Sequence, residues 1–204
     1  MILIPEIEKV LLLVPRTGSG SLRRAVLARY PQAMQVYRHM EADGVPIGYD
    51  HWQKVGVVRN PLDRLWSLYK FLGRFGIAHQ RYEHAYTKAQ RDSVDRPFDE
   101  WILRNKEVFT SPYDSAGLSR FWPQFCVRHP IPENVKSQWL TLRPDLGTEI
   151  WRYEDLHKLA VMLDITLERH NETAPNPVPK ISLEASEHVG RVFKWDYLYW
   201  EASS

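Results

Sequence analysis

Eight residues near the start of the chain combine the side chains that bind anions. The segment Pro15-Arg16-Thr17-Gly18-Ser19-Gly20-Ser21-Leu22 contains a cation, hydroxyl groups and glycines. Glycines let the backbone turn tightly and approach a ligand, while a helix that begins here would present free amides and the positive end of its dipole. The segment therefore predicts a phosphate site with Arg16 at its rim. A polar turn before an ordinary helix is the alternative on this segment alone.

The elements on either side of this loop indicate how it is held. The apolar run Val10–Val14 is typical of a strand buried on both faces, and the pattern of Leu22–Tyr30 predicts a helix after the loop. A second strand and helix follow at Val55–Val58, where Asn60 suits an N-cap and Pro61 suits the first helical position. Both units have the order strand, loop, helix.

Further elements complete an α/β pattern. Strands are also expected at 34–37 and 149–153, and helices at 97–107, 156–163 and 183–194. The helix after Pro61 is expected to end near Gly73 or Gly76. This alternation predicts one three-layer domain over residues 1–204, with a central, mainly parallel sheet of about four or five strands and helices on both faces.

Composition excludes several classes of protein. The 204 residues carry a formal net charge of only +2, so no global field favours nucleic acid as a partner. No apolar stretch approaches the length of a membrane span, and the lone cysteine, Cys126, fits a reducing compartment, so we expect a cytoplasmic protein. The histidines lack the spacing of zinc ligands. Neither Gly-Lys-Ser nor Gly-Lys-Thr occurs, so the magnesium-dependent loop of nucleoside triphosphatases is missing.

Two segments resemble the nucleotide-binding motifs of one enzyme family. The run Val57-Val58-Arg59-Asn60-Pro61-Leu62-Asp63-Arg64, followed by Ser67, is similar to the 3′-phosphate motif of sulfotransferases that use 3′-phosphoadenosine 5′-phosphosulfate (PAPS). That motif reads R-[ND]-P-x-[DE]-R, with a serine on the next helix. The loop after Val14 resembles the family's 5′-phosphosulfate loop, commonly P-K-T-[GA]-[ST]-[ST]-S-L. The motifs are closest to carbohydrate-type and bacterial members, and weaker likenesses to glycan-acting members lie at 137–140 and 150–156.

The resemblance implies a P-loop-like fold and a nucleotide site that needs no metal. Residues matching the 5′-phosphosulfate loop are Arg16, Thr17, Gly18, Ser19, Gly20, Ser21 and Leu22. Arg59 and Ser67 would bind the 3′-phosphate, for which a forked guanidinium and a hydroxyl are well suited. An ion pair of Arg59 with Asp63, and a plain polar helix position for Ser67, are the alternatives.

Two positions depart from the family pattern. Arg16 stands where many members carry a catalytic lysine, and Gly20 replaces a residue that commonly has a hydroxyl. Arginine can still neutralise charge on the leaving phosphate, although it cannot donate its proton as lysine does. We therefore expect Arg16 to take part in catalysis as well as in binding.

A base that accepts the proton of the acceptor is expected between the two motifs. Family members usually carry it about twenty residues before the arginine of the second motif, and His39 lies at that distance from Arg59. His39 also follows a predicted strand, where open α/β sheets place their chemistry. Glu41 is a second candidate, because some glycan-specific members use glutamate. His51 is a third, although it precedes the strand 55–58 at the other edge; that none of the three is the base is a further alternative.

These observations predict a sulfotransferase that moves the sulfuryl group of PAPS to a hydroxyl or amine by in-line displacement, leaving adenosine 3′,5′-bisphosphate. The acceptor is expected to be a small molecule or a saccharide. Aromatic residues that could stack on it, or belong to the core, are Phe109, Tyr113, Phe121 and Trp122. The alternatives are an inactive module that binds a bisphosphate nucleotide or an anionic glycan, and a nucleotide kinase-like phosphotransferase. The sequence predicts no oligomeric state.

Overall fold

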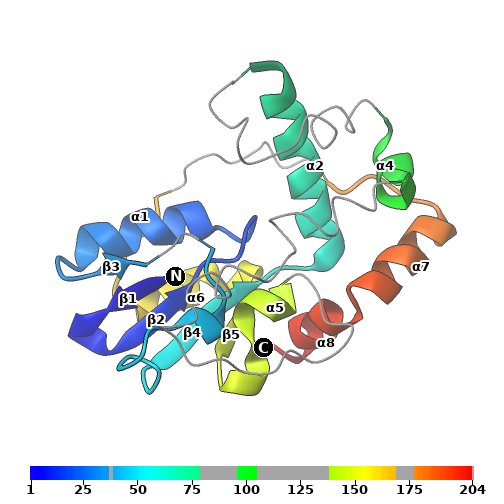
Figure 1. Cartoon of the computed structure of the whole chain (residues 1–204). Helices are drawn as coiled ribbons and strands as arrows, with labels where there is room; N and C mark the ends of the chain where they lie inside the picture. The colour runs from blue at the N-terminus through cyan, green and yellow to red at the C-terminus, as the bar shows by residue number, and fades with distance from the viewer. Residues whose placement is uncertain (37–38, 79–95, 105–137, 169–176, 204) are drawn as a thin grey trace.

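A computed structural model describes residues 1–36, 39–78, 96–104, 138–168 and 177–203. Its centre is a five-stranded sheet in the order β3-β1-β2-β4-β5 (Figure 1). The strands are β1 (Ile2–Ile4), β2 (Lys9–Leu12), β3 (Met34–Gln35), β4 (Gln53–Val58) and β5 (Glu149–Arg152). The helices are α1 (Ser19–Arg29), α2 (Pro61–Ala78), α4 (Phe98–Arg104), α5 (Gln138–Leu142), α6 (Leu156–Met162), α7 (Leu183–Val192) and α8 (Lys194–Ala202). The predicted α/β class is confirmed.

The sheet is mixed, whereas the sequence predicts a mainly parallel one. The strands β2, β4 and β5 pair in parallel, with Leu11 opposite Val55 and Val58 opposite Arg152. The unpredicted strand β1 pairs antiparallel with both β2 and β3, so it alone runs against the other four. Its three apolar residues are followed at once by Pro5, which left too short a run to identify as a strand. The carboxyl ends of β2, β4 and β5 therefore share one edge.

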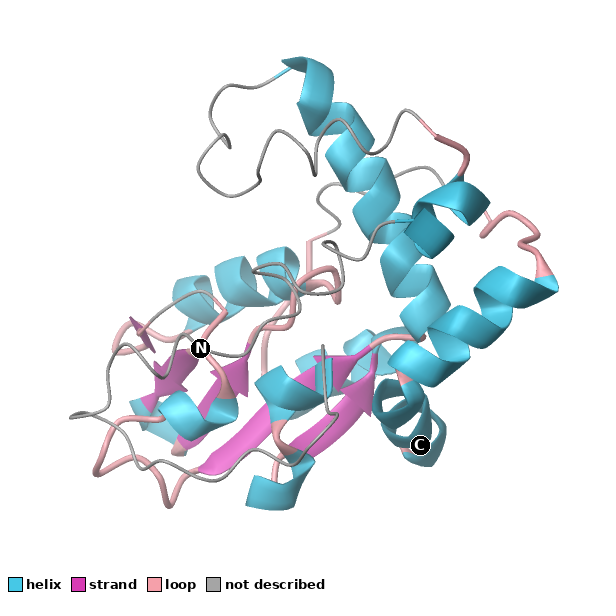
Figure 2. Ribbon diagram, turned by 45° about the vertical axis from the view of Figure 1, so that its right-hand side comes forward, coloured by secondary structure: helices cyan, strands magenta, loops and turns pink. Residues whose placement is uncertain are grey.

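Helices cover both faces of the sheet, as the sequence predicts (Figure 2). One face packs against α1 and α6 in a buried cluster that includes Leu11, Leu13, Val55, Val57, Leu22, Val26, Leu159 and Leu163. The other face packs against α5, α8 and the segment after β3, in a cluster that includes Val10, Leu12, Val58, Met40, Ala42, Leu142 and Trp200. Because side chains alternate along a strand, consecutive residues of β2 and β4 serve the two cores in turn.

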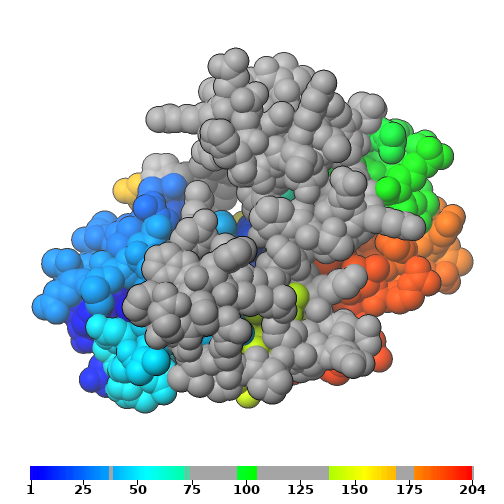
Figure 3. All heavy atoms as spheres, viewed as in Figure 1, coloured from blue at the N-terminus to red at the C-terminus, as the bar shows by residue number. Residues whose placement is uncertain are grey.

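A second group of helices lies beside the sheet. The helices α2, α4 and α7 share a core of Leu65, Leu68, Phe98, Trp101, Ile102, Ala185, Val189 and Phe193. In the space-filling view α4 and α7 lie on the opposite side of the molecule from α1 (Figure 3). The expected end of α2 at Gly73 or Gly76 is wrong, because the helix runs on to Ala78.

Two regions differ further from the sequence predictions. The expected helix 183–194 is confirmed as α7, which ends at Val192, but the sequence did not predict α8, which follows it from Lys194. The residues Phe109, Tyr113, Phe121, Trp122 and Cys126 lie outside the described part of the chain. Within the described part, no helix is both long and apolar enough to cross a membrane.

Candidate functional site

The loop between β2 and α1 holds two residues in the left-handed backbone region. Arg16 has a φ angle of 68° and Gly18 one of 76°. Between them Thr17 is buried, and its hydroxyl donates a hydrogen bond of 2.9 Å to the carbonyl oxygen of Val14. A non-glycine residue such as Arg16 adopts this conformation only where its surroundings hold it, and such residues cluster at binding sites. Thr17 thus braces the loop from within.

The helix α1 begins directly after this loop, at Ser19. The amides of Ser21 and Leu22 donate to the carbonyl oxygen of Gly18, at 3.0 and 3.1 Å, which closes the first turn. The first amides of a helix have no partner within the helix, and its dipole places a partial positive charge at the same end. The loop and the start of α1 therefore have the geometry that the predicted phosphate site requires.

Arg16 reaches from the loop to α2. Its Nε and Nη2 atoms donate to the hydroxyl oxygen of Ser67, at 3.1 and 2.8 Å. Its guanidinium carbon lies 4.5 Å from the ring centre of Phe71, one turn further along α2. Residues four apart lie on one face of a helix, so Ser67 and Phe71 together define the position of this cation. Two residues from separate motifs are thereby in direct contact.

Arg59 follows β4 and contacts the same loop. Its Nη1 atom donates to the carbonyl oxygen of Arg16 at 3.3 Å, and its guanidinium lies 4.4 Å from the ring centre of Tyr153. The Nε atom of Arg59 is buried and has no hydrogen-bond partner among the residues that the structure describes. The neighbouring Asn60 caps α2 as predicted, because its Oδ1 atom accepts from the amides of Leu62 and Asp63 at 3.0 and 3.3 Å. A second helix start thus adjoins the cation.

His39 lies at the carboxyl end of β2. Its Nδ1 atom is 2.7 Å from the carbonyl oxygen of Leu13, two residues before the loop begins. A carbonyl oxygen can only accept, so Nδ1 carries the proton, and Nε2 of the neutral ring is left with a lone pair. This is the tautomer that a general base requires, and the carbonyl fixes the orientation of the ring.

The two alternative bases lie elsewhere. His51 is exposed and precedes β4, whose first residue, Gln53, is opposite Lys9 at the start of β2. It therefore lies at the amino edge of the parallel strands, as the sequence predicts. Glu41 is buried, with 2% of its surface exposed, and precedes the 3-10 helix Ala42–Gly44. Of the three candidates, His39 is the one that contacts the main chain between β2 and the loop that precedes α1.

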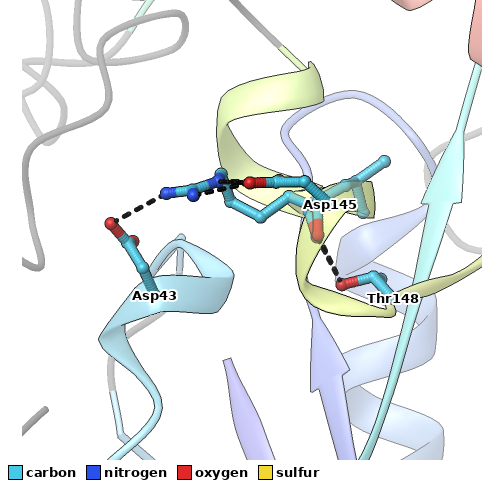
Figure 4. Close-up of polar contacts among 5 residues, drawn as sticks. Asp43, Asp145 and Thr148 are labelled. Atoms are coloured by element: carbon cyan, nitrogen blue, oxygen red, sulfur yellow. Dashed lines mark hydrogen bonds and ion pairs between the residues drawn. The ribbon is translucent and has the colours of Figure 1, made fainter. Parts of the chain in front are cut away.

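An ion-pair network around the buried side chain of Arg143 braces the segment that follows His39. The guanidinium of Arg143 lies 3.4 Å from Asp43 and 2.7 Å from Asp145, and Figure 4 shows the two carboxylates on either side of it. The hydroxyl of Thr148 donates to the carbonyl oxygens of Leu142 and Arg143. Hydrogen bonding to Asp145 raises the pKa of Arg143 above its ordinary value. The network joins the turn after His39 to the chain between α5 and β5.

Two residues at this edge were given no role by the sequence. Tyr153 follows β5 and places its ring under Arg59, while Gln138 starts α5 and hydrogen-bonds the main chain of Arg59. Both belong to the segments that weakly resemble glycan-acting sulfotransferases. For Tyr153, its position directly after a parallel strand was a signal that could have identified it. For Gln138 the sequence carried no such signal.

The assembled site is a cationic edge beside the imidazole of His39. It combines two guanidinium groups, the starts of α1 and α2, the hydroxyl of Ser67 and the imidazole of His39. Within the described residues, no group of three His, Cys, Asp or Glu side chains could hold a metal ion. Comparisons with protein-family models, curated proteins and solved structures found no match to this chain.

Proposed function

We propose that this protein is a PAPS-dependent sulfotransferase. The observation that carries the proposal is the hydrogen bonding that joins the two motifs: Arg16 donates to Ser67, and Arg59 donates to the carbonyl oxygen of Arg16. A ligand with two separate anionic groups needs two cationic sites at a fixed spacing. Two arginines held in one network, each beside a helix start, support such a ligand.

The anionic groups of the sulfuryl donor, PAPS, match these residues in charge. The loop amides and Arg16 would bind the 5′-phosphosulfate, and Arg59 with Ser67 would bind the 3′-phosphate. The buried, unpartnered Nε atom of Arg59 supports a phosphate there, because a buried donor without an acceptor is unfavourable and a phosphate oxygen would satisfy it. Ser67 is also buried, with 8% of its surface exposed. Its hydroxyl oxygen accepts from Arg16, and its hydroxyl hydrogen would donate to the 3′-phosphate.

The residues also fit the transfer step. The acceptor oxygen or nitrogen forms a bond to sulfur while the bond from sulfur to the bridging phosphate oxygen breaks. Nε2 of His39 accepts the acceptor's proton, and Arg16 neutralises the charge that develops on the adenosine 3′,5′-bisphosphate. The guanidinium of Arg16 lies between the loop and α2, where Ser67 and Phe71 contact it. The acceptor class, a hydroxyl of a saccharide or another small molecule, rests on the family resemblance.

Transfer of labelled sulfate tests this proposal. The protein is incubated with sulfur-labelled PAPS and a panel of saccharide, aryl and amine acceptors in the presence of a chelator. We expect a labelled product and an equal amount of adenosine 3′,5′-bisphosphate, both lost in Arg16→Ala. Binding of the bisphosphate without transfer to any acceptor favours the inactive binding module instead. Transfer from ATP that requires magnesium favours the kinase-like alternative.

A further inference from the structure

The main chain of Arg59 lies just beyond the paired part of β4. The last pair in the ladder joins Val58 to Arg152, so both backbone groups of Arg59 need a partner from elsewhere. Gln138 supplies both. Its Oε1 atom accepts from the amide of Arg59 at 2.9 Å, and its Nε2 atom donates to the carbonyl oxygen of Arg59 at 2.8 Å. A side-chain amide thus takes the place that a neighbouring strand would occupy.

Asp196 of α8 fixes which way this amide points. Its Oδ2 atom accepts from Nε2 of Gln138 at 3.4 Å and from the backbone amide of Gln138 at 3.2 Å. Its Oδ1 atom accepts from the amide of Trp139 at 2.9 Å, so the same carboxylate caps α5. If the side-chain amide of Gln138 were turned over, its Oε1 atom would face the carboxylate of Asp196 and the carbonyl oxygen of Arg59. All three of these oxygens accept hydrogen bonds, so the contact would be repulsive. A carboxylate can only accept, so the observed orientation alone satisfies all three residues.

The side chains that hold Arg59 are buried. Gln138 and Asp196 each expose 1% of their surface. In such surroundings a hydrogen bond to a charged group is strong, and a polar atom that loses its partner is costly. Since the main chain of Arg59 is held on one side by Gln138, its side chain is directed to Tyr153 and to the carbonyl oxygen of Arg16 on the other. A small shift of this backbone would displace the guanidinium from the position at which it meets a ligand.

We propose that Gln138 and Asp196 are positioning residues for Arg59, and that recognition of a 3′-phosphate depends on them although neither touches the nucleotide. The inference rests on the proposed function, which assigns the 3′-phosphate to Arg59. It links the helix α8, near the end of the chain, to the specificity of the nucleotide site. In Figure 1, α8 and α5 lie next to each other below the start of α2.

A pair of nucleotides separates this role from a general contribution to folding. Adenosine 3′,5′-bisphosphate and adenosine 5′-phosphate differ only in the 3′-phosphate. The dissociation constant of the 5′-phosphate divided by that of the bisphosphate therefore measures recognition of the 3′-phosphate. We expect Gln138→Met to lower this ratio about tenfold, because the backbone of Arg59 loses two hydrogen bonds while the side-chain length is kept. Asp196→Asn is a milder second variant. It removes the charge of the carboxylate that orients the side-chain amide of Gln138, so it should also lower the ratio, by a smaller factor.

Two reference variants complete the experiment. Thr141→Val removes another buried polar group from α5 and should leave the ratio unchanged. Arg59→Ala should abolish the discrimination, and Gln138→Met in that background should have no further effect on the ratio. Thermal unfolding of each variant identifies losses that come from stability alone.

The outcomes are distinct. A fall in the ratio for Gln138→Met and Asp196→Asn, but not for Thr141→Val, supports the inference. An unchanged ratio in both variants, or an equal loss of affinity for both nucleotides, overturns it while Arg59→Ala still supports the proposed function. If Arg59→Ala itself leaves the ratio at the wild-type value, the assignment of the 3′-phosphate to Arg59 is wrong, and the inference fails with it.

Discussion

Replacing Gly18 by alanine tests how the phosphate loop is held. The φ angle of Gly18 is 76°, and a Cβ atom built there lies 2.8 Å from Cδ1 of Leu156 and 3.4 Å from Cε2 of Tyr153. The left-handed backbone costs an alanine about 1–2 kcal/mol. Crowding against Leu156 adds about 1–3 kcal/mol, the usual range for an overpacked contact. We therefore expect Gly18→Ala to lower the free energy of unfolding by about 2–5 kcal/mol, a large part of a typical domain's stability.

Urea denaturation followed by tryptophan fluorescence measures this loss. Gly147→Ala is a matched control, because Gly147 has a φ angle of 75° and nothing within 4 Å of its built Cβ atom. That variant should lose only the backbone contribution. In a Leu156→Ala background the crowding is removed, so Gly18→Ala should again cost only about 1–2 kcal/mol. If Gly18→Ala destabilises the protein no more than Gly147→Ala, the contact between the loop and α6 does not constrain the loop and the reasoning is refuted.

Three further changes test the site and the sheet. Arg59→Ala should weaken binding of adenosine 3′,5′-bisphosphate by about 2–4 kcal/mol, measured by calorimetry in chelator; unchanged affinity contradicts the proposed phosphate contact. His39→Ala should reduce single-turnover transfer about 10²–10⁴-fold with little change in donor affinity. A collapse in His51→Ala instead would move the base to the other edge of the sheet. Gly56→Ala should destabilise the protein by about 1–3 kcal/mol in urea denaturation, because its Cβ atom would overlap Leu142; an unchanged midpoint shows that Leu142 moves freely.

Much of the fold was predictable because its signals are local. The runs Val10–Val14 and Val55–Val58 are apolar throughout, and strands buried on both faces require that composition. Asn60 and Pro61 mark the start of α2 through hydrogen bonding and a fixed φ angle, which operate within a few residues. Failures arose where packing opposed local preference. The helix α2 continues past two glycines, each unfavourable by about 1 kcal/mol, while its earlier turns share a core with α4 and α7.

The sequence by itself determined which residues carry the charge and the hydroxyl groups, and the strand ends at which they lie. Only the tertiary structure decided how they meet. Arg16 and Ser67 are 51 positions apart, Arg59 and Gln138 are 79 apart, and no local pattern encodes these pairs. They come together because parallel pairing of β2 with β4 places both motifs at one edge, and because the buried amide of Gln138 satisfies backbone groups that the sheet leaves unpaired. Contacts of this kind depend on which elements are neighbours, and that is settled by packing over the whole chain.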